Sequence, residues 1–263
     1  MNSNFDKIVN RRRSGSTKWE FYDSDVLPLW VADMDFVVPE AIQKELVARV
    51  KHGVFGYALS EAPTLLDEIC DRTNRLYDWK VLPEHIVFFP GLTSALNAIC
   101  SAFGKCGDGV VVQPPIYYPF LTAIKNQGRQ IKHAPLKRKD KHECIGYEVD
   151  FGVLERAITT RTNLFLLCNP HNPIGKLYST KVLGHIAQIC ERNDLIICSD
   201  EIHCELLLDQ KRHHRPTATL SPEIAARCIT LMAPSKTFNL AGLSCGYAII
   251  QNPALMEQVR KAT

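Results

Sequence analysis

The sequence predicts an α/β fold of three layers, in which helices cover both faces of a mainly parallel sheet. Beyond Pro83, short apolar runs alternate with amphipathic helical stretches, a pattern typical of parallel sheets that are buried on both faces. The composition allows a sizeable core, because 46% of the 263 residues are hydrophobic and 22% are charged. No repeat or low-complexity segment interrupts the alternation.

The stretch before this alternation predicts an extended segment followed by two helices. Residues 1–30 show no clear period. Pro39 is expected to begin the first helix, whose apolar residues recur every four positions, and Gly53 to end it. The second helix is expected over 63–76, after a glycine-bearing loop that contains Tyr57.

Two polar clusters in the first 36 residues are interpreted without a ligand. The arginines Arg11, Arg12 and Arg13 are expected to be solvated. Asp33 and Asp35 have no histidine or further carboxylate nearby, so a role in a turn or at a helix entry is favoured over a metal site. No metal is predicted.

Seven apolar runs are predicted as the strands of the sheet. They lie at 86–89, 110–113, 131–134, 164–168, 195–199, 228–232 and 247–250. Helices are predicted between several of them, at 92–103, 118–126, 151–158 and 179–193, with Ser179 as an N-cap.

Polar, aromatic or glycine-containing turns directly follow five of these strands. Ligands of parallel sheets bind outside the carboxyl ends of the strands, so we expect the five turns to form one site. The groups concerned are Gly91-Leu92-Thr93, Tyr117, Asn172, Asp200 and Ser235-Lys236.

Lys236 follows a buried strand, and two interpretations are open for it. Most lysines are solvated surface groups. A lysine at a buried site loses solvation, which lowers the pKa of its ammonium group and makes the neutral amine a usable nucleophile, as in enzymes that form a Schiff base. The other four strand ends favour the second interpretation, because together they supply what pyridoxal 5′-phosphate requires.

That cofactor needs a lysine for its aldehyde, a carboxylate at its ring nitrogen, a flat partner for its ring and an anion site for its phosphate. Asp200 can pair with the ring nitrogen, Asn172 can donate to the ring hydroxyl, and Tyr117 can stack on the ring. Gly91 precedes a predicted helix whose first N–H groups can bind the phosphate, and Ser235 can add a hydroxyl.

Three segments carry a family resemblance: Asn-Pro-His-Asn-Pro-Ile-Gly at 169–175, Ser-Asp-Glu-Ile-His at 199–203 and Ser-Lys-Thr-Phe-Asn at 235–239. They resemble the fold type I pyridoxal-phosphate enzymes of the class I/II aminotransferase superfamily. Trp-Val-Ala-Asp-Met-Asp-Phe at 30–36, with the Asp-Glu-Ile-His sequence, is similar to the cystathionine β-lyase branch of carbon–sulphur lyases.

The resemblance implies a role for each matching position, and an Asn172-Pro173 peptide bond that is cis. Tyr57 is implied to reach across a homodimer to the partner's phosphate. From position alone, Tyr57 or Tyr117 is expected to assist proton transfer. The other implied roles are the Schiff-base lysine for Lys236, the ring nitrogen for Asp200, the ring oxygen for Asn172, ring stacking for Tyr117, and the phosphate for Leu92, Thr93 and Ser235.

Two departures from the common aminotransferase pattern fit the lyase branch better. His203 stands where many aminotransferases have tyrosine, and Gly242-Leu243-Ser244 where many have a phosphate-binding arginine. His203 is expected near the cofactor, with a satisfied interior histidine as the alternative. Tyr118 is expected to be a packing residue.

The resemblance also implies domain boundaries. Residues 1–38 are expected to belong to a small domain, 39–250 to form the large cofactor-binding domain, and 251–263 to begin a helix that leads to an absent C-terminal domain. Relatives carry in that domain the arginine that binds the substrate carboxylate. The chain is therefore expected to be an N-terminal fragment or truncated product.

The predicted function is α,β-elimination of cystathionine or cysteine S-conjugates to a thiol, pyruvate and ammonia. Lys236 would exchange its imine with the substrate amine and then remove the α-proton. An aminotransferase is the first alternative, and a truncated protein that binds the cofactor or a partner without catalysis is the second. A nucleotide-binding Rossmann domain is disfavoured, because no Gly-x-Gly-x-x-Gly follows a strand.

The remaining features exclude other classes. Lys and Arg number 31 against 28 Asp and Glu, a balance that argues against nucleic acid or an anionic membrane as partner. The ten cysteines form no Cys-x-x-Cys pair and lie mostly in apolar runs, which favours reduced thiols in the cytoplasm. No apolar stretch approaches the length of a membrane span.

Overall fold

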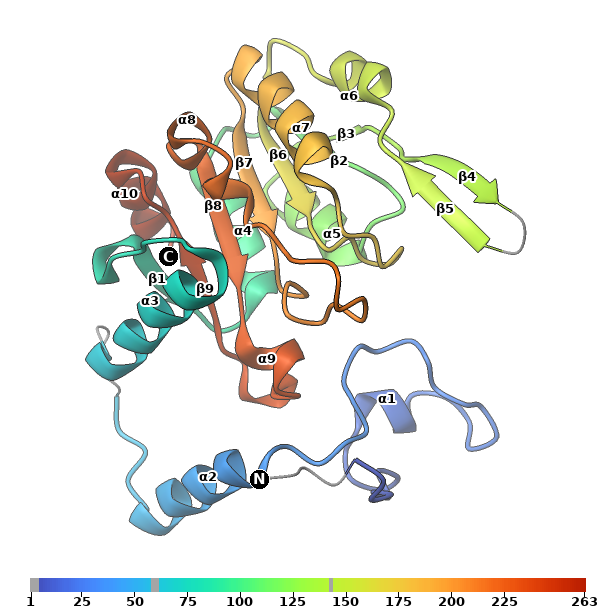
Figure 1. The fold of residues 1–263 in the computed structure, drawn as a ribbon, viewed down its shortest axis with the longest axis vertical. Coiled ribbons are helices and arrows are strands. Elements are labelled where there is room, and N and C mark those ends of the chain that lie inside the picture. The colour runs from blue at the N-terminus through green and yellow to red at the C-terminus, as the bar shows by residue number, and fades with distance from the viewer. Residues whose placement is uncertain (1–4, 58–61, 142–143) are drawn as a thin grey trace.

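The computed structural model describes residues 5–57, 62–141 and 144–263, and it has the predicted three-layer α/β fold (Figure 1). The sheet has the strand order β1-β9-β8-β7-β6-β2-β3. Neighbours from β8 to β3 are parallel, whereas β9 runs antiparallel to both β1 and β8. The strands are β1 (Ile86–Phe89), β2 (Gly109–Val112), β3 (Gln130–His133), β6 (Thr162–Cys168), β7 (Ile196–Asp200), β8 (Cys228–Met232) and β9 (Gly246–Ile249).

The predicted helices are all present, with ends that differ by a residue or two from those expected. They are α2 (Glu40–His52), α3 (Pro63–Tyr77), α4 (Leu92–Ala102), α5 (Tyr118–Asn126), α6 (Phe151–Ala157) and α7 (Thr180–Arg192). The structure adds α1 (Thr17–Glu20), α8 (Pro222–Ala225) and α9 (Pro234–Thr237), and the helix expected within residues 251–263 is α10 (Pro253–Lys261).

Two of the helix ends have the caps that the sequence predicts. Gly53 follows α2 in the left-handed region, at φ 77°, and its N–H bonds to the carbonyl of Arg49. Ser179 precedes α7, and its hydroxyl accepts a hydrogen bond from the N–H of Val182 at 3.4 Å. These caps satisfy backbone groups that a helix end leaves without intrahelical partners.

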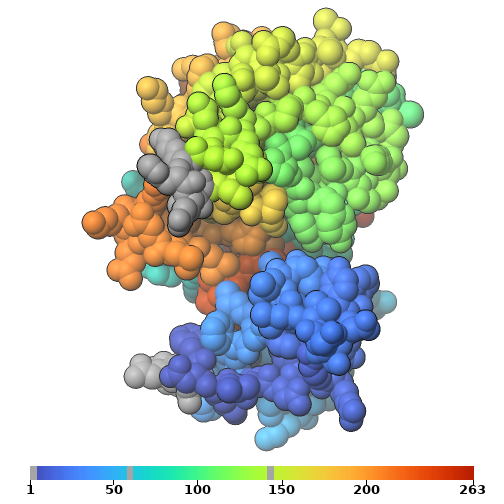
Figure 2. Space-filling view, turned by 90° about the vertical axis from the view of Figure 1, so that its right-hand side faces the viewer, coloured from blue at the N-terminus to red at the C-terminus, as the bar shows by residue number. Residues whose placement is uncertain are grey.

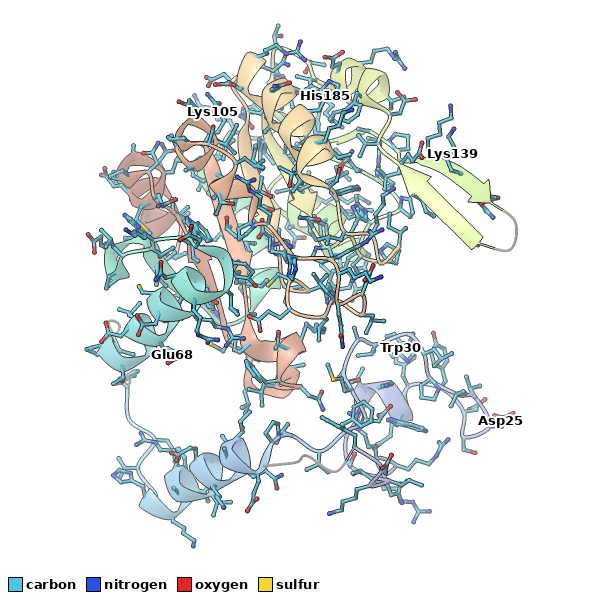
Figure 3. The ribbon with its side chains drawn as sticks, viewed as in Figure 1. Asp25, Trp30, Glu68, Lys105, Lys139 and His185 are labelled. Atoms are coloured by element: carbon cyan, nitrogen blue, oxygen red, sulfur yellow. The ribbon has the colours of Figure 1, made fainter. Side chains whose placement is uncertain are left out.

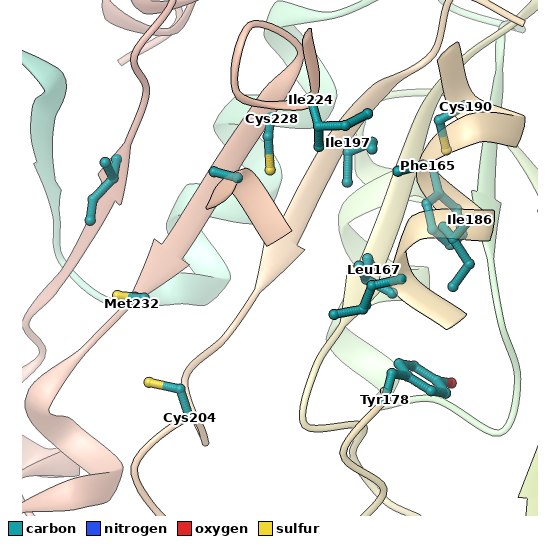
Figure 4. Packing of buried hydrophobic residues seen from close by; sticks show 14 of the residues in the cluster. Phe165, Leu167, Tyr178, Ile186, Cys190, Ile197, Cys204, Ile224, Cys228 and Met232 are labelled. Carbon is teal, nitrogen blue, oxygen red and sulfur yellow. The ribbon is translucent and has the colours of Figure 1, made fainter. Parts of the chain in front are cut away.

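The sheet separates two apolar cores. Side chains of successive strand residues point to opposite faces, so Val111 of β2 lies in one core and Val110 in the other. On the first face, Phe165 of β6 packs with Ile186 and Cys190 of α7 (Figure 4). On the second face, α4, α5 and α10 cover the sheet. Burial of this kind contributes about 25 cal/mol per Å² of apolar surface.

A hairpin of β4 (Lys137–Lys141) and β5 (Cys144–Glu148) was not predicted. It projects from the sheet beyond β3, and Lys139 lies on it (Figures 1 and 3). The run of charged residues that forms β4 has no alternation of apolar and polar side chains, so the sequence gives no strand signal there.

The N-terminal segment, residues 5–57, forms a lobe below the sheet (Figures 1 and 2). Its helix α2 has the predicted apolar period but no buried residue. The helix therefore forms as expected, yet most of its apolar side chains are exposed in the described chain, among them Leu46, Val47 and Val50. The expected boundary between residues 38 and 39 stays a prediction, as does an absent domain after α10.

Among the described residues, no helix is long and apolar enough to cross a membrane. The nine cysteines whose side chains are described are all free thiols. No group of His, Cys, Asp and Glu side chains in these parts of the chain is arranged to hold a metal ion.

Candidate active site

The predicted strand ends meet at one cavity of about 330 Å³ at the carboxyl edge of the sheet. Parallel strands β6, β7 and β8 end side by side there, and α4 begins beside them. The cavity brings together eight of the nine predicted site residues: Leu92, Thr93, Tyr117, Asn172, Asp200, His203, Ser235 and Lys236.

Tyr57 is the predicted site residue that the structure does not bring to this cavity. It lies in the N-terminal lobe and its side chain is fully exposed. Its implied contact with another chain stays a prediction, and it cannot act on the cavity of its own chain from this position.

Lys236 lies on α9, the single helical turn that follows β8. Its Nζ atom donates a hydrogen bond to the carbonyl oxygen of Ala32 at 2.9 Å. Burial lowers the pKa of the Lys236 ammonium group, while the charges of Asp33 and Asp200 oppose this shift. The amine is therefore more easily deprotonated than a surface lysine, as a nucleophile or base requires.

Asp200 is the last residue of β7 and is 6% exposed. Burial raises the pKa of its carboxyl group to about 7, because water no longer stabilises the charged form. A hydrogen bond from the N–H of Ile202, at 3.1 Å, opposes the shift, and the charge of Glu201 adds to it. Among the described residues, no other hydrogen bond reaches this carboxylate.

Tyr117 and Asn172 are joined through their backbones. The N–H of Tyr117 bonds to the carbonyl oxygen of Asn172 at 3.2 Å. The N–H of Asn172 in turn donates to Sγ of Cys168, the last residue of β6, at 3.4 Å. The Asn172-Pro173 peptide bond is cis, as the family resemblance implied. Tyr118 packs edge-on against the Tyr117 ring, with centroids 5.2 Å apart.

The start of α4 forms an open cradle for an anion. Gly91 precedes the helix at φ 104°, a conformation that side chains disfavour, and no side chain caps the helix. The first N–H groups of an α-helix have no intrahelical acceptor and favour negative charge. Close packing also requires Gly246, where a Cβ atom would lie 2.7 Å from a methyl group of Leu92.

His203 stands between two cavities. A second cavity, of about 470 Å³, shares Ala32, Asn172 and His203 with the first and is lined further by Leu206, Leu207 and Leu208. Burial lowers the pKa of His203, and the charge of Lys236 lowers it further, so the imidazole is neutral at pH 7. Of the two interpretations of His203, its position favours a cavity wall.

An ion cluster beside Lys236 was not predicted. Arg11 binds Asp33 at 2.6 Å and Asp35 at 2.7 Å, and Lys18 binds Asp35 at 2.7 Å. The Arg11 side chain is only 20% exposed, so the expectation of a solvated arginine was wrong for this residue. These bonds hold the pKa of Asp35 down at about 2, against the effect of burial.

Asn239 fastens the same segment to the lysine-bearing turn. Its side-chain oxygen accepts from the N–H of Met34 at 3.0 Å, and its amide nitrogen donates to the carbonyl oxygens of Met34 and Phe36. Trp30 lies nearby, on the side of the lobe that faces the sheet (Figure 3). The sequence shows both the motif at 30–36 and the motif at 235–239, but no sequence pattern predicts that the two segments bond to each other.

The site fits pyridoxal 5′-phosphate on its own geometry. A buried carboxylate with an unmatched oxygen faces the same cavity as an amine of lowered pKa and an uncapped helix start. Asp200 is costly to bury without a cationic partner, and the protonated ring nitrogen of the cofactor would be one.

A mainly parallel sheet with this set of groups at its carboxyl edge defines the large domain of a fold type I pyridoxal-phosphate enzyme. The chain belongs to the aminotransferase class I and II family, whose model matches residues 24–263. It is 43% identical over 253 residues to the cystathionine β-lyase PatB of Bacillus subtilis, covering 94% of this chain and 64% of that protein.

Two solved structures share the fold closely. OvoB superposes with a TM-score of 0.92 at 40% identity, covering 98% of this chain and 67% of that one. Cystalysin from Treponema denticola, which contains pyridoxal 5′-phosphate, also gives a TM-score of 0.92, at 32% identity, and covers 100% of this chain and 67% of that one. The chain therefore spans about two thirds of the length of these relatives.

Proposed function

We propose that this chain is the cofactor-binding part of a pyridoxal-phosphate-dependent carbon–sulphur lyase. The observation that carries the proposal is the convergence of Lys236, Asp200 and the open start of α4 on one cavity. The similarity to a cystathionine β-lyase supports the reaction type. We propose cystathionine or a cysteine S-conjugate as the substrate.

Each group of the cavity would hold one part of the cofactor. Lys236 would hold the aldehyde carbon, and Asp200 the protonated ring nitrogen. The residues that would hold the remaining parts are Asn172 at the ring oxygen, Tyr117 on the ring face, and Leu92, Thr93 and Ser235 at the phosphate. When bound, the cofactor supplies an electron sink for the bond between the substrate's α-carbon and its proton.

The protein's own part in the reaction is proton transfer and positioning. Nζ of Lys236, as a neutral amine, would remove the substrate's α-proton. Tyr117 stands close enough to the cavity to donate a proton to the leaving sulphur, although burial raises the pKa of its hydroxyl. The substrate and one water would yield a thiol, pyruvate and ammonia.

The second cavity gives the substrate's sulphur substituent a place to lie. It shares Ala32, Asn172 and His203 with the first cavity, and leucine side chains form much of its wall, beside Asp209 and Arg212. A substrate amine held near Lys236 would direct its side chain toward this wall. We therefore expect apolar sulphur substituents to bind at least as well as the charged one of cystathionine.

An aminotransferase is the alternative within the same family, and the family to which the chain belongs favours it as a second candidate. A protein that binds the cofactor without turnover is the third. One observation favours it: among the described residues, no arginine lines the first cavity to bind a substrate carboxylate.

We also propose a homodimer in the cytoplasm. Large apolar side chains of the N-terminal lobe are exposed, and a second copy would cover them; they include Phe36, Leu46, Val50, Phe55 and Tyr57. Free thiols in a reducing compartment fit a cytoplasmic location. Sedimentation of the purified chain tests the dimer, and a monomer at all concentrations would refute it.

One experiment separates the candidate functions. The purified chain is loaded with pyridoxal 5′-phosphate and given cystathionine or an S-aryl cysteine, and free thiol and pyruvate are measured. A lyase releases both without a keto acid, whereas an aminotransferase transfers the amino group only when a keto acid is present. Covalent cofactor with neither reaction supports the third candidate. No covalent cofactor, with Lys236→Ala behaving identically, would exclude all three.

A further inference from the structure

A buried carboxylate and imidazole lie directly behind Asp200, outside the candidate cavity. Glu201 follows Asp200 in the chain, and successive side chains of an extended segment point to opposite faces. Ser199 shares the face of Glu201, and its hydroxyl donates to Oε1 of Glu201 at 2.7 Å. Asp200 lines the cavity, whereas Ser199 and Glu201 do not.

Both oxygens of Glu201 receive hydrogen bonds. Oε1 also accepts from the N–H of Thr217 at 2.9 Å, and Oε2 lies 2.6 Å from Nε2 of His214. The side chains of Glu201 and His214 are 0% and 1% exposed. Three donors around one carboxylate favour its ionised form, which only accepts hydrogen bonds.

The second ring nitrogen of His214 decides the charge of the pair. Nδ1 is buried and has no hydrogen-bond partner among the described residues. A proton on Nδ1 would create a buried cation whose donor lacks an acceptor, which is more costly than an unpaired lone pair. The arrangement therefore favours a neutral imidazole that donates through Nε2, so the pair carries one negative charge.

We propose that the Glu201–His214 pair is a fixed negative charge that backs Asp200 and, through it, keeps a proton on the ring nitrogen of the cofactor. The link to the cofactor rests on the proposed function, whereas the charge is a property of this chain alone. Glu201 and His214 act here as positioning residues, since neither touches the cavity.

The physical reason is the weak screening of buried charge. Two neighbouring carboxylates stabilise a cation at the ring nitrogen more than one does. The same charge raises the pKa of Asp200, as burial does. Without it, Asp200 and the ring nitrogen together would hold their shared proton less tightly, and a ring that lost the proton would withdraw electrons less well.

Other ionisable groups also face the two carboxylates. Burial raises the pKa of the thiols and phenols among them, so these are neutral near pH 7. Lys236 and Glu205 are the others. Among the described residues, these groups are Lys236, Tyr117, Cys168 and Cys198 around Asp200, and Tyr77, Cys204, Glu205 and Cys228 around the Glu201–His214 pair.

Carboxyl-carbon NMR of the cofactor-free chain, labelled with ¹³C in its Asp and Glu carboxyl groups, tests the charge directly. Asp200→Asn identifies the Asp200 signal. We expect Glu201→Gln to lower the pKa of Asp200 by about one, the scale of a nearby buried charge. Glu205→Gln is the matched control, because Glu205 lies in the same loop but pairs with Arg72.

Two further measurements separate charge from packing. His214→Asn removes the ring yet leaves a donor for Glu201, so the pKa of Asp200 should stay close to that of the unsubstituted chain. An unchanged Asp200 titration in Glu201→Gln would overturn the proposal. Should that variant not fold, the Glu201 signal of the unsubstituted chain decides: an ionised carboxylate at pH 7 supports the charge, and a protonated one refutes it.

The cofactor is tested separately, with pyridoxal 5′-phosphate labelled with ¹⁵N in its ring. In the unsubstituted chain we expect the ¹⁵N shift of a protonated ring, and in Glu201→Gln a move toward the unprotonated value. An unchanged ¹⁵N shift in Glu201→Gln would refute the link between this charge and the cofactor. Failure of the unsubstituted chain to bind the cofactor would refute the proposed function and leave the carboxyl titration unaffected.

Discussion

Replacing Asp200 with asparagine should stabilise the cofactor-free chain, and the gain should depend on pH. The carboxyl group has an ordinary pKa of 3.8 and a pKa of about 7 in the folded chain. Its ionisation is therefore easier in the unfolded chain. As pH rises from about 4 to 7, ionisation of Asp200 increasingly favours unfolding, and above pH 7 the effect is constant.

The gap between the two pKa values corresponds to about 4 kcal/mol, an upper figure because buried groups relax. Asparagine keeps an oxygen for the N–H of Ile202 but carries no charge. We expect Asp200→Asn to match the unsubstituted chain at pH 4 and to exceed its unfolding free energy by up to about 4 kcal/mol above pH 7.

Urea unfolding at a series of pH values, with the cofactor removed, measures this difference. Subtracting the two stability curves cancels every group that titrates equally in both chains. A difference in unfolding free energy that is flat between pH 4 and 8, or that favours the aspartate at high pH, would refute the assignment of Asp200 as a buried carboxylate without a cationic partner. Adding the cofactor should reverse the order of the two proteins.

Three further outcomes are expected. Lys236→Ala should abolish cofactor attachment that survives borohydride reduction, as mass spectrometry would detect; retained mass on another lysine would contradict the site. Arg11→Met should lower the unfolding free energy by about 1 kcal/mol, because it breaks two partly buried ion pairs, whereas Lys44→Met, which breaks an exposed pair, should leave it unchanged in the same urea titration. Gly91→Ala should destabilise the chain by about 1 kcal/mol and weaken phosphate binding in calorimetry, because φ there is 104°. Gly184→Ala, inside α7 with open space around it, should stabilise by about 0.5 to 1 kcal/mol; equal effects at the two glycines would contradict the backbone argument.

Much of the fold could be predicted because its strands are short apolar runs with clear ends. The bounds of β1 and β8 match the prediction, and those of the other sheet strands lie within two residues of it. The hairpin β4–β5 was missed because charged residues form it, and the antiparallel direction of β9 has no local signature. Pairing direction depends on where the chain returns to the sheet, which periodicity does not encode.

The site was predictable for a different reason. Each group directly follows a strand, so the rule for parallel sheets placed Asp200 and Lys236 together without knowledge of distances. That rule does not predict contacts made by segments outside the sheet. The ion pairs of Arg11 and the hydrogen bond from Lys236 to Ala32 join segments more than twenty residues apart that share no element. Tyr57 shows the converse, because a family motif gave it a role that a single chain does not display.

The clamp between Asn239 and Met34 has a consequence for the order in which this protein becomes complete. The two residues are 205 positions apart, so Met34 leaves the ribosome long before its partner exists. Strands β2, β3, β6 and β7 can pair during that interval, whereas β1 must wait for β9 and the N-terminal lobe must wait for Asn239. The hydrogen bonds that join residues 32–36 to the turn bearing Lys236 and Asn239 are therefore among the last to form during synthesis.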